Sequence, residues 1–273
     1  MIKLTWSCLI VKEVPFEKQK KRVFNLWEST EEESVEIEYY SPDQKNCDAA
    51  VIIFPGGGYR GRTEYEGKDY AEMISKWGIA SFVVQYRVFP ERFPKPLMDA
   101  RRAIQFVRSK AIEFGIDKNK IAVMGSSAGG HLAALVSTFT KIVDMPCDKI
   151  GAESYLPNAQ ILCYPVISSD ERISHKGSYQ NLLGEGYQDR AKYSPELLVD
   201  AKTPSAFIWH TADDASVSVL NSYRYAEALK NNGVSCEMHI FPNGRHGLGL
   251  AIDNPQVSKW AELLQTWIIH TLK

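Results

Sequence analysis

The sequence lacks a signal for export or membrane insertion. Residues 1–14 contain neither a positively charged start followed by a long apolar core nor a small-residue cleavage site. An excess of one charge is also missing, because 32 Lys and Arg residues against 33 Asp and Glu residues leave a formal net charge of -1. No net field therefore attracts nucleic acid or anionic lipid, and the short basic run at 18–22 is interpreted as a solvated face. We expect a cytoplasmic protein with neither a nucleic-acid nor a membrane partner.

Cysteine is scarce, and its spacing does not suit a metal site. The five cysteines are odd in number, lie far apart and include no C-x-x-C pair, which fits neither a disulfide framework nor a zinc site. Cys163 and Cys236 occur in apolar or alternating runs and are interpreted as packing residues. We expect reduced thiols and no bound metal.

The composition that is present is typical of a globular protein. Hydrophobic residues make up 44% and charged residues 24% of the 273 residues. This length suffices to bury a continuous core, and no repeat, low-complexity tract or Pro-rich linker divides the chain. We therefore expect a single domain spanning residues 1–273.

The hydrophobic pattern predicts strands that alternate with helices. Short apolar runs rich in β-branched and aromatic residues predict strands at 34–40, 50–54, 80–86, 120–124, 160–164, 205–210 and 235–241, with an eighth at 5–11. Apolar residues at spacings of three and four predict helices at 65–77, 97–114, 128–138, 217–231 and 257–272. In the second of these helices, Arg101, Arg102 and Lys110 are expected on the side away from the apolar stripe.

Alternation of strands and helices requires crossover connections. It therefore predicts an α/β fold with an eight-stranded, mostly parallel sheet covered by helices on both faces, the first strands forming an antiparallel edge. Segments 141–159 and 168–203 have weak periodicity and are predicted as excursions from the sheet that shape a binding site. No long hydrophobic segment lies between the strands, so we expect no large cap domain.

The strongest motif is GSSAGG at residues 125–130, between a predicted strand and a predicted helix. This is G-x-S-x-G in the strand–turn–helix context of a nucleophile, where small flanking residues permit a very tight turn. Ser127 would project at the N-terminus of the helix, where the dipole and free N–H groups favour developing negative charge. The alternative interpretation is a loop with a helix cap, and Ser126 is the neighbour that a mutational test must exclude.

A serine nucleophile needs a base that is oriented by a carboxylate. Where the serine lies on such a strand–turn–helix, the chain order is serine first, then aspartate or glutamate, then histidine. Among the six histidines, His246 lies in a glycine-flanked loop directly after the last predicted strand and is the candidate base. His175 in an excursion and His210 at a strand end are weaker alternatives. The other three lie in helices or inside a strand and are interpreted as structural or surface residues: His131, His239 and His270.

The other parts of such a site, a carboxylate and oxyanion donors, also follow strand ends. Asp213 and Asp214 come after the strand at 205–210, and either could orient the base while the other caps the next helix. The backbone N–H groups of Gly57 and Gly58, paired with that of Ala128, would bind the oxyanion. A flexible turn or a phosphate cradle is the alternative, but the glycine run is not followed by G-K-[ST] and does not form G-x-G-x-x-G.

Together these motifs resemble the α/β-hydrolase superfamily along nearly the whole chain, and within it bacterial acetyl esterases and carbohydrate esterases related to acetyl xylan and feruloyl esterases. The resemblance is carried by PGGGY (55–59), YR (86–87), DARRA (99–103), GSSAGGHL (125–132), WHTADD (209–214) and NGRHG (243–247). The family's aspartate is followed three positions later by valine, which matches Asp214 and Val217 and favours Asp214 over Asp213. Two departures are Ser218, where the family has proline, and Pro55, where many relatives have histidine.

The resemblance also implies roles for three residues near the glycine run and the strand ends. It implies that Tyr59 lines the pocket, although an aromatic residue after glycines could simply pack against the sheet. It further implies that Arg87 and Asp99 form a buried ion pair near the site.

The function hypothesis is a serine carboxylic-ester hydrolase for short acyl, above all acetyl, esters of small molecules such as acetylated sugars. Ser127, His246 and Asp214 would catalyse the reaction without a metal or organic cofactor. A histidine base, with a reference pKa of about 6.5, predicts activity that rises through neutral pH. The alternatives are an amide hydrolase, such as an arylformamidase or a small peptidase, and a catalytically idle binding protein on the same fold. The sequence leaves the oligomeric state open, a homo-oligomer included.

Overall fold

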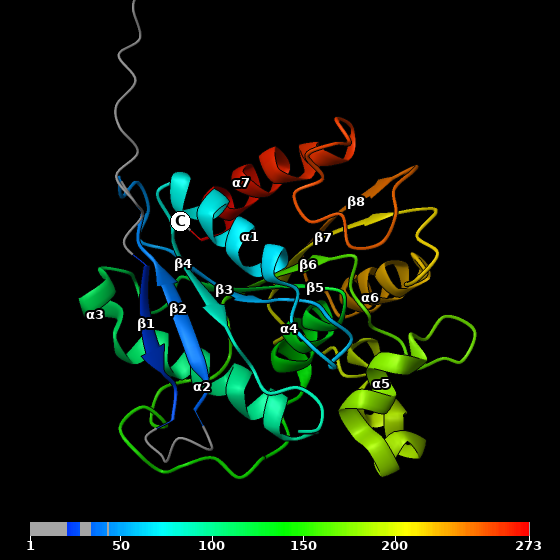
Figure 1. The fold of residues 1–273 in the computed structure, drawn as a ribbon, viewed down its shortest axis with the longest axis horizontal. Helices are drawn as coiled ribbons and strands as arrows, with labels where there is room; N and C mark the ends of the chain where they lie inside the picture. Colours follow the sequence, from blue (N-terminus) through cyan, green and yellow to red (C-terminus); the bar gives the residue numbers. More distant parts are fainter. Residues whose placement is uncertain (1–20, 28–33, 43, 273) are drawn as a thin grey trace, which may run out of the picture.

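The computed structural model describes residues 21–27, 34–42 and 44–272 (Figure 1). Its centre is an eight-stranded sheet with the order β1-β2-β4-β3-β5-β6-β7-β8. The strands are β1 (Lys21–Asn25), β2 (Glu36–Tyr40), β3 (Ala50–Phe54), β4 (Ala80–Val84), β5 (Ile121–Ser126), β6 (Ala159–Cys163), β7 (Ser205–Thr211) and β8 (Cys236–Phe241). β1 and β2 form the antiparallel edge, and the strands from β4 to β8 are parallel. The predicted α/β fold with a mostly parallel sheet is confirmed.

Helices cover both faces of this sheet. They are α1 (Glu64–Lys76), α2 (Lys95–Ser109), α3 (Ala111–Phe114), α4 (Ala128–Thr138), α5 (Lys176–Leu183), α6 (Leu220–Asn231) and α7 (Trp260–Thr271), with 3-10 turns η2 (Gly184–Tyr193), η3 (Pro195–Leu197) and η4 (Val257–Lys259). Figure 1 shows α1 and α7 on one side of the sheet and α2, α4 and α6 on the other. None of the described helices has the length and apolar character needed to cross a membrane.

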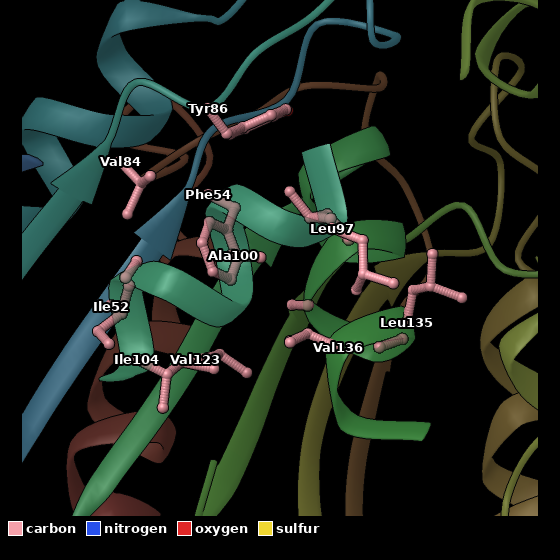
Figure 2. Close-up of a cluster of buried hydrophobic side chains, with 14 of the residues drawn as sticks. Ile52, Phe54, Val84, Tyr86, Leu97, Ala100, Ile104, Val123, Leu135 and Val136 are labelled. Atoms are coloured by element: carbon pink, nitrogen blue, oxygen red, sulfur yellow. The ribbon is translucent and has the colours of Figure 1, made fainter. Parts of the chain in front are cut away.

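The central strands alternate their side chains between two apolar cores. In β3, Ile52 and Phe54 pack in the core formed with α2 and α4 (Figure 2). Val51 and Ile53 belong to the core formed with α1 and α7. Every residue of β3 is therefore buried, which explains why the strand is a continuous apolar run. The two cores hold the carboxyl ends of the strands, and the loops that follow them, on a rigid support.

The antiparallel edge differs from the prediction. Lys21 and Arg22 are exposed, as expected for the basic run at 18–22, but they also begin β1, which no apolar pattern predicts. The backbone of β1 pairs with β2, so an exposed strand is added to the sheet through main-chain hydrogen bonds. The strand predicted at 5–11 lies outside the described residues.

The helix predicted at 97–114 is divided at Lys110, whose backbone is not helical (φ -103°, ψ 17°). Arg101 and Arg102 lie away from the apolar stripe but are buried rather than solvated. Arg101 donates to the carbonyl of Phe139, and Arg102 donates to the carbonyl of Leu26. The two guanidinium groups thus donate to backbone carbonyls of segments that are distant in the chain. Helical spacing alone does not predict these contacts.

The two predicted excursions leave the sheet at the expected places. Residues 141–158, all of them described, contain no helix or strand. The longer segment between β6 and β7 contains α5, η2 and η3, which its weak periodicity did not predict. Asn181 of α5 donates to the carbonyl of Gly58 at 2.9 Å, so this excursion packs against the glycine run.

Candidate active site

Ser127 lies at the turn between β5 and α4. Its backbone has φ 53° and ψ -118°, a strained conformation for a residue with a side chain. Two glycines leave no room for a Cβ in this turn. A Cβ at Gly125 would lie 2.1 Å from the carbonyl oxygen of Gly129, and one at Gly129 would lie 2.0 Å from that of Phe54. The small residues of the motif therefore permit a tight elbow that presents Ser127 at the start of α4.

Three of the predicted site residues meet at the carboxyl ends of β5, β7 and β8. The Oγ atom of Ser127 lies 2.8 Å from Nε2 of His246, and Nδ1 of His246 lies 2.6 Å from Oδ2 of Asp214. Ser127 and His246 are 119 positions apart in the chain. They meet because parallel strands end at the same edge of the sheet. The structure thus forms a continuous hydrogen-bonded series of hydroxyl, imidazole and carboxylate.

Asp214 is held in place and kept ionised. Its side chain is 0% exposed, Oδ1 accepts the backbone N–H of Val217 at 2.9 Å, and Oδ2 lies 3.3 Å from Nε2 of His210. Burial by itself would raise the pKa of Asp214, but hydrogen bonds from His210, His246 and Val217 outweigh burial and hold that pKa well below its usual range. An ionised carboxylate at this position can accept Nδ1–H of His246, which leaves Nε2 free to accept the proton of Ser127.

The glycine run lies beside the nucleophile turn. A Cβ added to Gly56 would lie 3.2 Å from the Cβ of Ser127. Gly57 and Gly58 have φ values of 133° and 65°, in the region that favours glycine. Within the described residues, the backbone N–H groups of Gly57, Gly58 and Ala128 donate to no protein acceptor. These donors are therefore available to a ligand oxygen.

Tyr59 does not line an open pocket, contrary to what the resemblance implies. Its side chain is 1% exposed, and its hydroxyl lies 2.7 Å from Nδ1 of His131. Nε2 of His131 lies 2.9 Å from the carbonyl oxygen of Tyr193. A carbonyl can only accept, so Nε2 carries the proton and the hydroxyl of Tyr59 donates to Nδ1. The tyrosine ring packs in the core behind the glycine run, which was the alternative interpretation.

The remaining candidates make other contacts. The hydroxyl of Ser126 is buried and donates to a tyrosine hydroxyl at 3.2 Å, not to an imidazole. Asp213 accepts a backbone N–H of the loop that carries the histidine, at 2.6 Å. His175 contacts the first turn of α5, and His210 lies beside Asp214. No group of three or more His, Cys, Asp or Glu in 21–27, 34–42 and 44–272 has an arrangement that could hold a metal ion.

The predicted ion pair of Arg87 and Asp99 is present. Nη2 of Arg87 lies 2.6 Å from Oδ1 of Asp99, whose side chain is 0% exposed. Asp99 also accepts the backbone N–H of Arg87 at 2.8 Å and Nε1–H of Trp27 at 2.9 Å. The pair anchors the segment after β4 to α2. It takes no part in the hydrogen bond between Ser127 and His246.

Two buried residues beside the site were not predicted from the sequence. Glu66, in the first turn of α1, accepts the backbone N–H of Gly56 and the hydroxyl of Tyr164. The ring of Tyr164 packs edge-on against that of His246, with 5.1 Å between centroids. An acidic residue in the first turn of a helix is common because the dipole favours it, so the pattern alone does not indicate burial. The one signal in the sequence is that this helix begins shortly after the glycine run.

Sequence comparisons connect the chain to known proteins. A profile of the family described as BD-FAE matches residues 37–229. The chain is 39% identical over 207 residues to an acetylxylan esterase of Xylanibacter ruminicola, and 34% identical over 209 residues to endo-1,4-beta-xylanase B of Butyrivibrio fibrisolvens. The two alignments cover 73% and 74% of this chain. They span only 41% and 33% of the relatives' own lengths.

Solved structures give matches along nearly the whole chain. An acetyl ester-xyloside bifunctional hydrolase from Caldicellulosiruptor lactoaceticus is 40% identical with a TM-score of 0.85, and the alignment covers 92% of this chain and 97% of that one. Esterase 2 of Thermogutta terrifontis, in a structure phosphoramylated by tabun, is 27% identical with a TM-score of 0.77. That alignment covers 92% of this chain and 94% of the esterase.

Proposed function

The chain belongs to the BD-FAE family and has the α/β-hydrolase fold, and from this premise we propose that it is a serine carboxylic-ester hydrolase for acetyl esters of sugars. One observation carries the proposal, namely the hydrogen-bonded series of Ser127, His246 and Asp214 at the carboxyl ends of the strands. Because one fold hosts many activities, this local geometry is a stronger argument than the fold itself.

Each residue of the series has a distinct role in the proposed reaction. Ser127 Oγ attacks the carbonyl carbon of the ester while Nε2 of His246 takes its proton, and Asp214 stabilises the imidazolium. His246 then gives this proton to the departing alcohol oxygen, which leaves the acyl group on Ser127. A water molecule attacks the acyl-enzyme, His246 takes the water's proton, and the acid is released with the proton returned to Ser127.

The tetrahedral intermediate carries a negative oxygen that needs donors. We assign this role to the backbone N–H groups of Gly57, Gly58 and Ala128, which have no protein acceptor in the described part of the chain. The N-terminus of α4 adds the positive end of its dipole at the same place. Each well-placed donor contributes about 100- to 1,000-fold in rate in such sites.

An acetylated sugar is the substrate class that best fits the relatives and the surroundings of the glycine run. Relatives named for acetylxylan and for acetyl ester-xyloside hydrolysis support this class. A Cβ at Gly58 would lie 3.9 Å from the hydroxyl oxygen of Ser178, which in turn contacts His175 at 2.8 Å. The start of α5 thus brings a hydroxyl and an imidazole to the glycine run, where sugar hydroxyls can hydrogen-bond.

A substrate panel tests the proposal. We expect turnover of p-nitrophenyl acetate and of acetylated xylooligosaccharides, slower turnover of longer acyl esters, and little turnover of N-formylkynurenine. Ser127→Ala should lose about 1,000-fold or more in kcat. Ser126→Ala, which removes the neighbouring hydroxyl, is the matched control and should retain activity.

The panel also separates the competing functions. Preference for N-formylkynurenine would replace the esterase proposal by an amide hydrolase. Absence of turnover on every substrate would favour a binding protein. Full activity of the Ser127→Ala variant would refute the assignment of the nucleophile.

A further inference from the structure

A buried carboxylate outside the Ser127 series contacts both loops of the candidate site. Glu66 is 3% exposed, and each of its carboxylate oxygens accepts a hydrogen bond. Oε2 accepts the backbone N–H of Gly56 at 2.9 Å, and Oε1 accepts the hydroxyl of Tyr164 at 2.7 Å. In the part of the chain that the structure describes, no cation is in ion-pair contact with Glu66. A carboxylate buried with neutral donors alone costs stability, and such groups recur at functional sites.

The first contact holds the peptide that precedes an oxyanion donor, Gly57. The carbonyl oxygen of Gly56 accepts the N–H of Thr63 at 2.9 Å, while the N–H of Gly56 donates to Glu66. In a planar trans peptide the C=O and the following N–H point in opposite directions, so the bond from Thr63 also sets the direction of the Gly57 N–H. Within the described residues, Gly56 is thus held by two hydrogen bonds, one to the side chain of Glu66 and one from the backbone of Thr63.

The second contact reaches the loop that carries His246. The hydroxyl of Tyr164 donates to Glu66 and accepts the backbone N–H of Gly249 at 3.0 Å. The ring of Tyr164 packs against the His246 ring at 5.1 Å and 71°. A Cβ at Gly247 would lie 3.9 Å from Oε1 of Glu66, so the carboxylate also approaches the backbone next to His246.

Glu66 also brings a negative charge close to His246. Burial raises the pKa of Glu66 above its usual range, and the hydrogen bonds of its two donors and the charge of His246 only partly oppose this effect. Both oxygens accept hydrogen bonds, which is the pattern of an ionised carboxylate. Other charged or titratable groups around His246 in the described residues include Asp214, which accepts Nδ1–H, His175 at the start of α5, the neighbouring Arg245, and Tyr164.

We propose that Glu66 is a positioning residue for the esterase reaction: it holds the peptide of Pro55 and Gly56, which precedes the oxyanion donor Gly57, it fixes the loop of His246, and it favours the imidazolium that forms when Ser127 loses its proton. This inference rests on the proposed function. All three effects act mainly in the transition state, so kcat should change more than KM.

Two variants and one control test the proposal. Glu66→Gln keeps the shape but removes the charge, and because an amide nitrogen does not accept, only one of the two hydrogen bonds can remain. We expect kcat for p-nitrophenyl acetate to fall about 10- to 100-fold with KM within about threefold. The acidic midpoint of the kcat/KM profile should move to lower pH by about half a unit or more, because a negative charge near the imidazolium is lost.

Tyr164→Phe removes the hydroxyl that donates to Glu66 and leaves the carboxyl group itself in place. Its kcat should fall by about tenfold with a smaller shift of the midpoint than in Glu66→Gln, because the hydrogen bonds to Glu66 and Gly249 are lost while the carboxyl group stays in place. Tyr225→Phe is the matched control, since it removes a buried hydroxyl that bonds to Gln160 at 2.9 Å. It should lower the melting temperature without changing kcat or the midpoint.

Active-site titration with a fluorophosphonate corrects each kcat for the fraction of reactive protein. Unchanged kcat and midpoint in Glu66→Gln would overturn the proposal, as would a loss of kcat no larger than that of Tyr225→Phe. If Glu66→Gln does not fold, an unchanged kcat in Tyr164→Phe overturns it. A wild-type protein without turnover would refute the proposed function and, with it, the positioning role. An active wild type whose Glu66→Gln variant is equally active would refute the positioning role alone.

Discussion

Lowering the pH should destabilise the protein through His131, a buried imidazole in the first turn of α4. It is 1% exposed, and both ring nitrogens already have partners, the hydroxyl of Tyr59 and the carbonyl of Tyr193. Burial lowers the pKa of His131 to about 4, although the hydrogen bond to Tyr193 partly opposes this effect. A proton added to Nδ1 would place a charge in the core and point a donor at the Tyr59 hydroxyl, which now donates to that nitrogen.

The direction and size of the effect follow from the two pKa values. A histidine in the unfolded chain has a pKa of about 6.5. Between this value and about 4, the unfolded chain binds the proton and the native protein does not, so the free energy of unfolding falls as the pH falls. The loss is about 3 kcal/mol in total and levels off below the lower pKa.

Urea unfolding at a series of pH values, in wild type and in His131→Gln, measures this contribution. The glutamine side chain can accept from Tyr59 and donate to Tyr193 without titrating. The wild type should therefore lose about 3 kcal/mol more than the variant between about pH 7 and pH 4. His270→Gln on the exposed side of α7 is the control and should follow the wild type. Parallel curves for wild type and His131→Gln would refute the reasoning.

Two further substitutions test the site and its support. Asp214→Asn should lower kcat about 1,000- to 10,000-fold, because the amide no longer selects the Nδ1–H form of the histidine or stabilises its cation. Asp213→Asn should retain activity. Equal losses of kcat for the two variants in steady-state assays would contradict the choice of aspartate. Asp99→Asn should lower the free energy of unfolding by about 3 kcal/mol, because Arg87 is left without its buried partner; an unchanged urea midpoint would show that the pair does not support the fold.

The fold could be predicted where local pattern and tertiary environment agree. The strand Ala50–Phe54 is buried on both faces and is therefore an unbroken apolar run. β1 was not predicted because its residues are mostly exposed, and its strand conformation depends on pairing with β2. Arg101 and Arg102 follow the polar side of a helical pattern, yet segments from elsewhere in the chain cover them. Pairing partners and covering segments are non-local, and a local pattern does not contain them.

The candidate site could be predicted to the extent that its residues follow strand ends. Ser127, Asp214 and His246 each come directly after a predicted strand, in the chain order that the fold requires. Glu66 could not be predicted in the same way, because it lies in the first turn of a helix and not at a strand end, and its contact with Tyr164 is visible only in the folded chain. Tyr59 was assigned to the pocket by resemblance alone, and its burial against His131 corrects this.

Mapping the residue that a fluorophosphonate modifies tests the central claim most directly. Ser127 is the hydroxyl within 2.8 Å of Nε2 of His246, whereas the hydroxyl of Ser126 donates to Tyr70. Peptide mass spectrometry should therefore find a single adduct, on Ser127, in wild type and in Ser126→Ala, and no adduct in Ser127→Ala. An adduct on another serine, or labelling that survives in Ser127→Ala, would contradict the account.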